Sequence, residues 1–310
     1  MKTAIIGAGG FVGRAIVERL RADGHDVLPI VRAPIGLSGE QAINDLVTAD
    51  LAALLRGVDA VILTAARVHM MDDRAADPLA AFRLVNRDGA VAAYRGAVEA
   101  GVRRFVFVSS VKVNGEATQP SRPFTADDPP APEDPYGVSK YEAEQELTAL
   151  AAAGGPELVI VRPPLVYGPG VRANFGAMMK WLGRGIPLPL GAVTGNRRGL
   201  VGLDNLVDFI VLCLTHPKAA GETFLVSDGR DVSTTELLRL LGSVLGKPAR
   251  LLPVPPAALR GLGRLTGKGS ALQRLTGSLQ VDIGKNREML GWTPPVSLEE
   301  GLRRAAAAKR

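Results

Sequence analysis

The chain has 310 residues, enough for one large domain or two of about 150 residues each. Hydrophobic residues make up 46% of it and charged residues 22%, which excludes a disordered chain. The single cysteine, Cys213, excludes an internal disulfide and a cysteine-based metal site. The formal charge is +6, but aromatic residues make up only 5%, so we expect anionic small molecules rather than nucleic acid as partners.

The sequence lacks the signals of a membrane span, a signal peptide and a zinc site, and these features bear on the expected location and cofactor. No apolar run approaches the ~18 residues of a membrane span, and the glycine-punctuated N-terminus lacks the cleavage site of a signal peptide. The three histidines are too few for a histidine-rich zinc site. We therefore expect a cytoplasmic protein with no membrane span and no metal ion.

Short apolar runs alternate with segments of helical spacing through the first half of the chain. We predict strands at residues 3–6, 27–31, 60–63, 105–109 and 158–161, and a first helix at 11–21. This alternation predicts an α/β fold of the Rossmann type, a doubly wound parallel sheet covered on both faces. Pro29 lacks an amide donor, so the second strand is predicted to bulge or to begin late.

The composition of the sequence changes past Val166, where proline and glycine become frequent. We predict an NAD(P)-binding domain from residues 1–165 plus about 200–227. A smaller C-terminal α/β substrate domain is predicted from residues 166–199 and 228–310. A basic helix is expected at residues 260–277, as a solvated face or a substrate lid in preference to a membrane-surface element.

Three glycines, Gly7, Gly10 and Gly13, follow the first strand and open the first helix. Glycine permits a tight turn and lets backbone amides approach a pyrophosphate at a helix N-terminus. This turn, with Phe11 and Val12 at the start of the helix, is therefore predicted to bind a dinucleotide.

The second strand ends at Arg32, with no acidic residue at its tip to bind a ribose hydroxyl. Arg32 and Arg14 can instead bind a 2′-phosphate, because a guanidinium fork matches phosphate oxygens. We therefore predict NADP(H), with NAD(H) as the alternative.

Two dipeptides complete the predicted cofactor site. Asp50 and Leu51 come where the third strand is expected to end and suit the adenine edge. Ala65 and Ala66 follow the fourth strand, where small side chains let the cofactor pass close to the backbone.

Tyr136 and Lys140 lie four residues apart and share one face of a predicted helix. A lysine ammonium beside a phenol is expected to lower the pKa of the tyrosine from ~10 and make it an acid or base near neutral pH. Ser110 ends a predicted strand at the cofactor crevice, where its hydroxyl can bond the same substrate oxygen.

With these motifs the chain resembles the extended short-chain dehydrogenases/reductases that act on nucleotide sugars, over nearly its whole length. The matching motifs are Gly7–Gly13, Asp50-Leu51, Asn86, Ser109-Ser110, Tyr136–Lys140, residues 162–169, Arg198 and Gly291-Trp292. The resemblance implies a UDP-sugar substrate and a homodimer formed through helices near residues 76–100 and 136–153.

The resemblance also implies roles for single residues. Ser110, Tyr136 and Lys140 are implied to be catalytic, with Lys140 also holding the nicotinamide ribose. Pro163 lies in the matched segment and is expected beside the cofactor. Asn174 and Arg198 are implied to lie near the diphosphate of the substrate, where a cation is needed. We further expect His69 to line the sugar site, with a surface loop as the alternative, and Lys112 to reach either substrate or solvent.

Departures from the family narrow the expected reaction. Dehydratases of the family carry an Asp-Glu pair after the active-site hydroxyl residue, whereas this chain has Val111 and Lys112. What remains is oxidoreduction at C4. We predict reduction of a UDP-4-keto-6-deoxy-(N-acetyl)hexosamine by NADPH for surface-polysaccharide synthesis. The alternative is a UDP-hexose 4-epimerase with bound NAD, and a non-enzymatic NADP sensor is a distant third.

Overall fold

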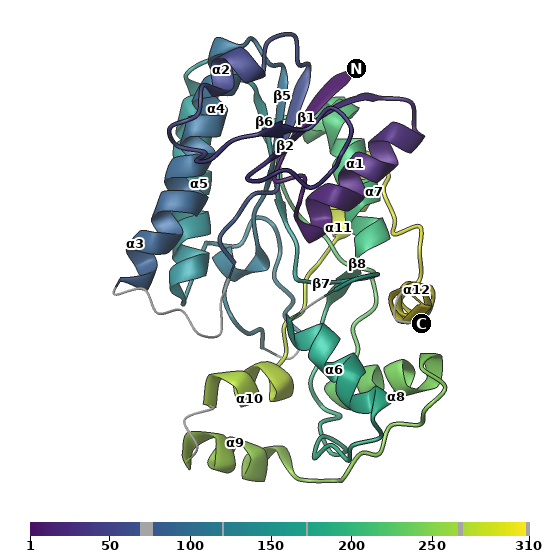
Figure 1. Cartoon of the computed structure of the whole chain (residues 1–310). Coiled ribbons are helices and arrows are strands. Elements are labelled where there is room, and N and C mark those ends of the chain that lie inside the picture. The colour runs from purple at the N-terminus through teal and green to yellow at the C-terminus, as the bar shows by residue number, and fades with distance from the viewer. Residues whose placement is uncertain (69–76, 120, 172, 266–268, 308–310) are drawn as a thin grey trace.

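The computed structural model describes residues 1–68, 77–119, 121–171, 173–265 and 269–307. A parallel sheet in the order β3-β2-β1-β4-β5-β6-β9 forms its centre, which confirms the doubly wound fold (Figure 1). Its strands are β1 (Lys2–Ile6), β2 (Asp26–Val31), β3 (Gln41–Ala42), β4 (Ala60–Leu63), β5 (Arg104–Val108), β6 (Glu157–Arg162) and β9 (Thr223–Leu225). A separate pair consists of β7 (Leu165–Tyr167) and β8 (Leu200–Gly202).

Helices cover both faces of the sheet (Figure 1). One face carries α1 (Phe11–Ala22), α7 (Leu203–Thr215) and α11 (Gly284–Leu290). The other carries α2 (Leu51–Leu54), α4 (Gly89–Glu99) and α5 (Pro135–Ala152). Alternate strand residues point to opposite cores: Ile5 packs in the first and Ile6 in the second. Burial on both faces explains why the strands are continuously apolar.

The second strand does not bulge at Pro29, and the prediction there was wrong. Pro29 pairs in register with Ile5 of β1. The Ile30 carbonyl accepts the amides of Gly7 and Ala8 on the β1 side, so the nitrogen of Pro29 faces the β3 side. Because β3 begins pairing only at Ile30, the missing donor has no strand opposite it.

The remaining elements extend these layers or build the C-terminal lobe. Helices α3 (Pro78–Arg83), η1 (Leu84–Asp88, a π-helical turn), η2 (Val111–Val113) and η3 (Pro217–Ala219) connect parts of the sheet layers. The lobe contains α6 (Ala173–Gly183), α8 (Thr234–Val244), α9 (Pro256–Leu265), α10 (Gly269–Thr276) and α12 (Leu298–Ala307).

A third hydrophobic cluster forms the core of this C-terminal lobe. It includes Phe175 of α6, Leu238 of α8 and Leu302 of α12. The helix predicted at 260–277 is two helices, α9 and α10, packed against each other. In the part of the chain that the structure describes, no helix is long and apolar enough to cross a membrane.

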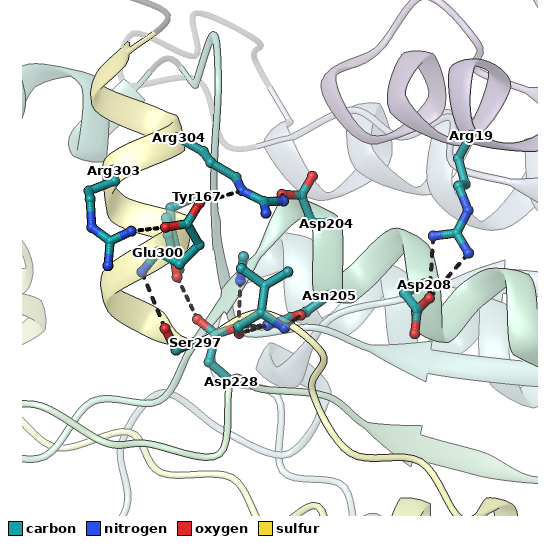
Figure 2. Close-up of polar contacts among 12 residues, drawn as sticks. Arg19, Tyr167, Asp204, Asn205, Asp208, Asp228, Ser297, Glu300, Arg303 and Arg304 are labelled. Atoms are coloured by element: carbon teal, nitrogen blue, oxygen red, sulfur yellow. Dashed lines mark hydrogen bonds and ion pairs between the residues drawn. The ribbon is translucent and has the colours of Figure 1, made fainter. Parts of the chain in front are cut away.

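A buried polar network joins the lobe to the sheet layers (Figure 2). The Tyr167 hydroxyl donates to Asp228 Oδ2 over 2.7 Å, and Asp228 Oδ1 accepts from the Gly202 amide (2.8 Å) and from Asn205 Nδ2 (2.7 Å). Asn205 also bonds both the amide and the carbonyl of Val296. Burial raises the pKa of Asp228, while its three donors favour the charged form.

Ion pairs bridge the helices around this network (Figure 2). Arg19 of α1 contacts Asp208 of α7 at 3.3 Å, and Arg304 of α12 contacts Asp204 of α7 at 2.7 Å. Both pairs are partly exposed, so each contributes little to stability by itself. They connect α1 and α12 to α7.

Candidate functional site

The glycine turn packs too closely to admit side chains at two of its positions. Gly7 has φ +94°, and an added Cβ would lie 2.5 Å from the Ala65 amide nitrogen. A Cβ on Gly13 would lie 2.2 Å from the Gly7 carbonyl oxygen. The turn is therefore pressed between the start of α1 and the end of β4.

The N-terminus of α1 presents backbone amides that can bind an anion. Its N-cap is Gly10, which offers no side-chain acceptor, and the first turn has no acidic residue. The first intrahelical bond runs from the Arg14 amide to the Gly10 carbonyl at 2.9 Å. The amides of Phe11, Val12 and Gly13 precede that bond and suit a pyrophosphate.

The tip of β2 carries an exposed arginine. Arg32 forms no ion pair among the described residues, and Arg14 lies 3.9 Å from Glu18 in an exposed pair. Past Arg32 the loop closes on Glu40, whose carboxylate accepts the amides of Ile35, Gly36 and Leu37. The sequence prediction did not find Glu40, because it lies eight residues after Arg32 and is brought back by the loop.

The third strand ends earlier than predicted, at Ala42 instead of near Asp50. Asp50 instead caps α2, accepting the Ala53 amide at 3.0 Å, while Leu51 is buried against α4. Ala65 follows β4 as predicted and donates its amide to the Ile6 carbonyl at 3.0 Å. It and the next residue, Ala66, are half-buried beside the glycine turn.

Ser110 lies directly beyond the carboxyl end of β5 and is 9% exposed. Its Oγ accepts a hydrogen bond from the Lys112 amide at 3.3 Å. The amide of Val111, the residue after Ser110, donates to the Pro163 carbonyl at 3.0 Å. Pro163 is buried just past β6, so these bonds hold the ends of β5 and β6 together. The carboxyl edge of a parallel sheet is where such folds bind ligands.

Tyr136 enters this edge from the first turn of α5. Asp134 caps the helix by accepting the Gly137 amide at 2.7 Å. The Tyr136 ring meets Phe82 edge-on, 6.0 Å between centroids. Burial raises the pKa of Tyr136 to about 12, a hydrogen bond with Ser110 opposes that rise, and the Asp134 carboxylate adds to it. Ser110 and Tyr136 are therefore brought together.

Lys140 does not lower the pKa of Tyr136, and the predicted coupling between them was wrong. The lysine is 1% exposed, and its Nζ lies 4.0 Å from the centroid of the Phe107 ring. Burial lowers the pKa of Lys140 to about 7, which Glu144 partly opposes. An amine with a pKa of about 7 is only half protonated near pH 7, so it supplies a weaker positive field to the phenol than an ordinary lysine does.

Within the described residues Lys140 Nζ has no hydrogen-bond partner. An unpaired buried amine is costly unless a ligand supplies acceptors. With the uncapped amides of α1, it forms a site whose donors fit the hydroxyls and phosphates of a dinucleotide. These residues would hold such a cofactor through the glycine turn at one end and Lys140 at the other.

Asn86 positions the start of α5. It lies in the π-helical turn η1, a feature common at functional sites. Its Oδ1 accepts the Arg67 amide at 2.8 Å, and its Nδ2 donates to Ser139 Oγ at 2.9 Å. Ser139 in turn donates to the Tyr136 carbonyl at 2.8 Å. This chain of bonds links the loop after β4 to the turn that carries Tyr136.

Lys112 is held by carboxylates of its own chain. Its ammonium pairs with Glu116 at 2.7 Å and with Asp134, the cap of α5. Arg198 donates to the Arg274 carbonyl of α10 at 2.7 Å, and burial lowers the pKa of its guanidinium, which nearby Glu116 opposes. Lys112 and Arg198 thus face the same glutamate.

Two predicted substrate residues are not tested by these contacts. His69 lies outside the described residues, and so does the side chain of Asn174, although its backbone belongs to α6. Cys213 is fully buried in α7, and burial raises the pKa of its thiol, which makes it a core residue. Across the described ranges, no group of acidic, histidine or cysteine side chains could hold a metal ion.

Comparison with known proteins identifies the family. The NAD dependent epimerase/dehydratase family matches residues 3–227. A Vibrio cholerae protein described as UDP-glucose 4-epimerase is 47% identical, over 98% of this chain and 94% of its own length. A Mycolicibacterium smegmatis protein of the same description is 30% identical, over 97% and 96%. The chain therefore belongs to the NAD-dependent epimerase/dehydratase family.

A solved structure agrees with this assignment. A short-chain dehydrogenase/reductase superfamily protein from Agrobacterium tumefaciens, solved with bound NAD, superposes with a TM-score of 0.80 at 25% identity. The match covers 100% of this chain and 97% of the other. The chain is thus an enzyme of the extended short-chain dehydrogenase/reductase branch expected from its motifs.

Proposed function

We propose that this enzyme carries out oxidoreduction at C4 of a UDP-sugar, as reduction of a UDP-4-keto-6-deoxy-(N-acetyl)hexosamine in surface-polysaccharide synthesis. The observation that carries the proposal is that Ser110, Tyr136 and Lys140 meet at the carboxyl edge of the sheet, the edge that also carries the glycine turn after β1. Two hydroxyls that can meet one substrate oxygen, backed by a buried amine, suit proton transfer at a carbonyl.

In this mechanism Tyr136 is the proton donor. With its pKa raised to about 12 by burial, the phenol keeps its proton at neutral pH and can give it to the oxygen at C4. Ser110 donates a hydrogen bond to the same oxygen and orients it. The nicotinamide supplies the hydride when bound. Lys140 would donate to the ribose hydroxyls and gain the acceptor that its Nζ lacks.

The preference for NADP(H) over NAD(H) is part of the proposal. Arg32 is exposed at the tip of β2 without an ion pair in the described part of the chain, and Arg14 directly follows Gly13 in the first turn of α1. Two guanidinium groups there favour a 2′-phosphate. Binding of NADP(H) through its 2′-phosphate fits a reductase that takes up a new NADPH at each turnover.

A 4-epimerase with bound NAD is the second candidate, supported by the description of the Vibrio cholerae relative. Epimerisation begins with removal of a proton from the C4 hydroxyl, so it needs Tyr136 as a phenolate. Burial opposes that form by raising the pKa of Tyr136 to about 12. We rank reduction first because Arg32, and not an acidic residue, stands at the tip of β2 and favours NADP(H) over bound NAD.

The deciding experiment identifies the nucleotide that the purified protein releases on denaturation, followed by assays of two substrates. Substoichiometric NADP(H), or none, with NADPH oxidation on a UDP-4-keto-6-deoxy-N-acetylhexosamine, supports the reductase. Stoichiometric NAD with interconversion of UDP-glucose and UDP-galactose supports the epimerase and contradicts the role given to Arg32. Turnover of neither substrate contradicts both candidates.

Three companion proposals concern assembly, architecture and substrate contacts. We propose a homodimer through the α4 and α5 layer, where Val98 is 44% exposed, testable by light scattering. We keep the predicted division into cofactor and substrate domains and the cytoplasmic location. Arg198 and Asn174 are proposed to contact the diphosphate of the UDP-sugar, and His69 and Lys112 to lie near the sugar.

A further inference from the structure

Acidic residues are absent from two segments of the chain, 163–203 and 237–281, which together hold twelve lysines and arginines. In the whole chain, one residue in ten is acidic. The two segments include α6, α9, α10 and most of α8, and we call them the basic lobe. The positive charge of the protein is therefore concentrated in one part of the fold.

Five basic residues of this lobe face outward. Lys180, Arg184, Lys247, Arg250 and Arg260 are all exposed. None of the five pairs with a carboxylate among the residues that the structure describes, whereas Arg19, Arg230 and Arg304 elsewhere do. Their charge is not neutralised within the protein and is available to an anionic partner.

Helix α9 also exposes leucines. Leu259 is buried, and four residues on, a Cβ at Gly263 would lie 2.8 Å from Leu272 of α10, so this face packs inward. Leu262 and Leu265 share another face and are 56% and 87% exposed. A helix with basic residues and two outward leucines is typical of a membrane-surface element.

Further apolar side chains lie on the chain segments next to α9. Leu252, 51% exposed, precedes the helix, and its amide donates to the Leu188 carbonyl at 2.8 Å. Ile186, 41% exposed, lies two residues before that partner, and its amide bonds the carbonyl of Trp181, itself 51% exposed. In Figure 1 α9 and α10 form the end of the molecule farthest from the N-terminus.

We propose that the basic lobe docks on an anionic phospholipid bilayer, with Leu262 and Leu265 inserted among the lipids and the surrounding bases on the headgroups. The argument for this occupant is charge complementarity combined with apolar exposure. Nucleic acid would use the bases but not the leucines. A second copy of the lobe would bring positive charges against positive charges, because the two segments of the lobe contain no acidic residue.

Docking would also bear on the site. Arg198, proposed to contact the substrate diphosphate, donates to the Arg274 carbonyl in the last turn of α10. The helix pair that meets the bilayer is therefore bonded to a residue of the substrate site. The surface proposal itself does not depend on the identity of the substrate.

The test is flotation of the full-length protein with vesicles of phosphatidylcholine alone and of phosphatidylcholine mixed with phosphatidylglycerol. We expect binding only to the mixed vesicles, weakening as salt is raised. Leu262→Ser/Leu265→Ser should lower the partition coefficient about tenfold or more. Arg250→Gln/Arg260→Gln should lower it several-fold.

Matched controls come from residues outside the basic lobe. Leu84→Ser removes a side chain that is 52% exposed, and Arg56→Gln/Arg122→Gln removes two exposed charges, and neither should change binding. Equal binding to both vesicle types, or no binding to either, overturns the proposal. So does binding that ignores the two leucines, or a dimer that only the leucine variant loses.

Discussion

Two buried polar groups of this protein differ in how far the chain itself satisfies them. At the seam with the C-terminal lobe, Asp228 accepts three hydrogen bonds, from Tyr167, Gly202 and Asn205. At the site, Lys140 is more deeply buried, yet its Nζ has no hydrogen-bond partner within the described residues. The comparison teaches that a completed polar network holds the fold, whereas an incomplete one marks where a ligand supplies the missing partners.

The largest effect is expected from Tyr136→Phe, which removes a hydroxyl from the incomplete network. Turnover should fall by ~10²–10⁴-fold, because the group proposed to protonate the C4 oxygen is lost. Stability should change by less than ~1 kcal/mol, because the ring keeps its contact with Phe82. Steady-state kinetics and urea denaturation measure the two. Undiminished turnover would favour the non-enzymatic sensor.

In the completed network, Asp228→Ala should cost about 3–5 kcal/mol of unfolding free energy, because it removes the acceptor of three buried hydrogen bonds. The matched variant Asp228→Asn keeps one acceptor oxygen and should cost less. The urea midpoint reports both variants. A cost below ~1 kcal/mol for the alanine variant would show that the seam is not held by this network.

Lys140→Met should do the opposite and stabilise the nucleotide-free protein by about 2–4 kcal/mol, while abolishing turnover. The pKa of Lys140 is about 7 in the fold against 10.5 for an ordinary lysine. Between those values the unfolded chain binds more protons, so wild-type stability should rise with pH from about 7 to 10.5.

The pH dependence supplies the control for that prediction. Lys140→Met should lack the rise contributed by this lysine, whereas a surface variant such as Lys247→Met should retain it. Denaturation curves at several pH values across the window test this. A wild-type stability that falls as pH rises there would contradict the burial of an unpaired amine.

The smallest effect is expected at Arg32, which also has no ion-pair partner among the described residues. Arg32→Ser should raise KM for NADPH about tenfold and leave KM for NADH nearly unchanged, since only the phosphorylated ribose loses a partner. Arg56→Ser, which removes an exposed charge elsewhere, is the control. Equal changes for both cofactors would mean that Arg32 does not read the 2′-phosphate.

Much of the fold could be predicted from the sequence, because its signals are local. The predicted strand at 60–63 coincides with β4, and the predicted helix at 11–21 ends one residue before α1 does. The errors have tertiary causes. Pro29 is tolerated because β3 is two residues long, and α9 and α10 are separate helices where one was expected.

The site was less predictable, since its chemistry depends on packing. Spacing placed Tyr136 and Lys140 on one helix, but the rise in the pKa of Tyr136 comes first from burial, to which the Asp134 carboxylate at the cap of that helix adds. The contacts of Glu40, and those of Lys112 with its carboxylate partners, likewise depend on the conformation of loops. No periodicity in the sequence carries that information.

The strand order has a consequence for the newly made chain. β9 completes the sheet beside β6, yet it follows β6 by some 60 residues that first build β7, α6, β8 and α7. On the ribosome, the first six strands emerge well before their last neighbour, so β6 waits with one open edge. The interval between synthesis of Arg162 and Thr223 is therefore when a nascent chain is most exposed to wrong pairing, and when chaperones would act on it.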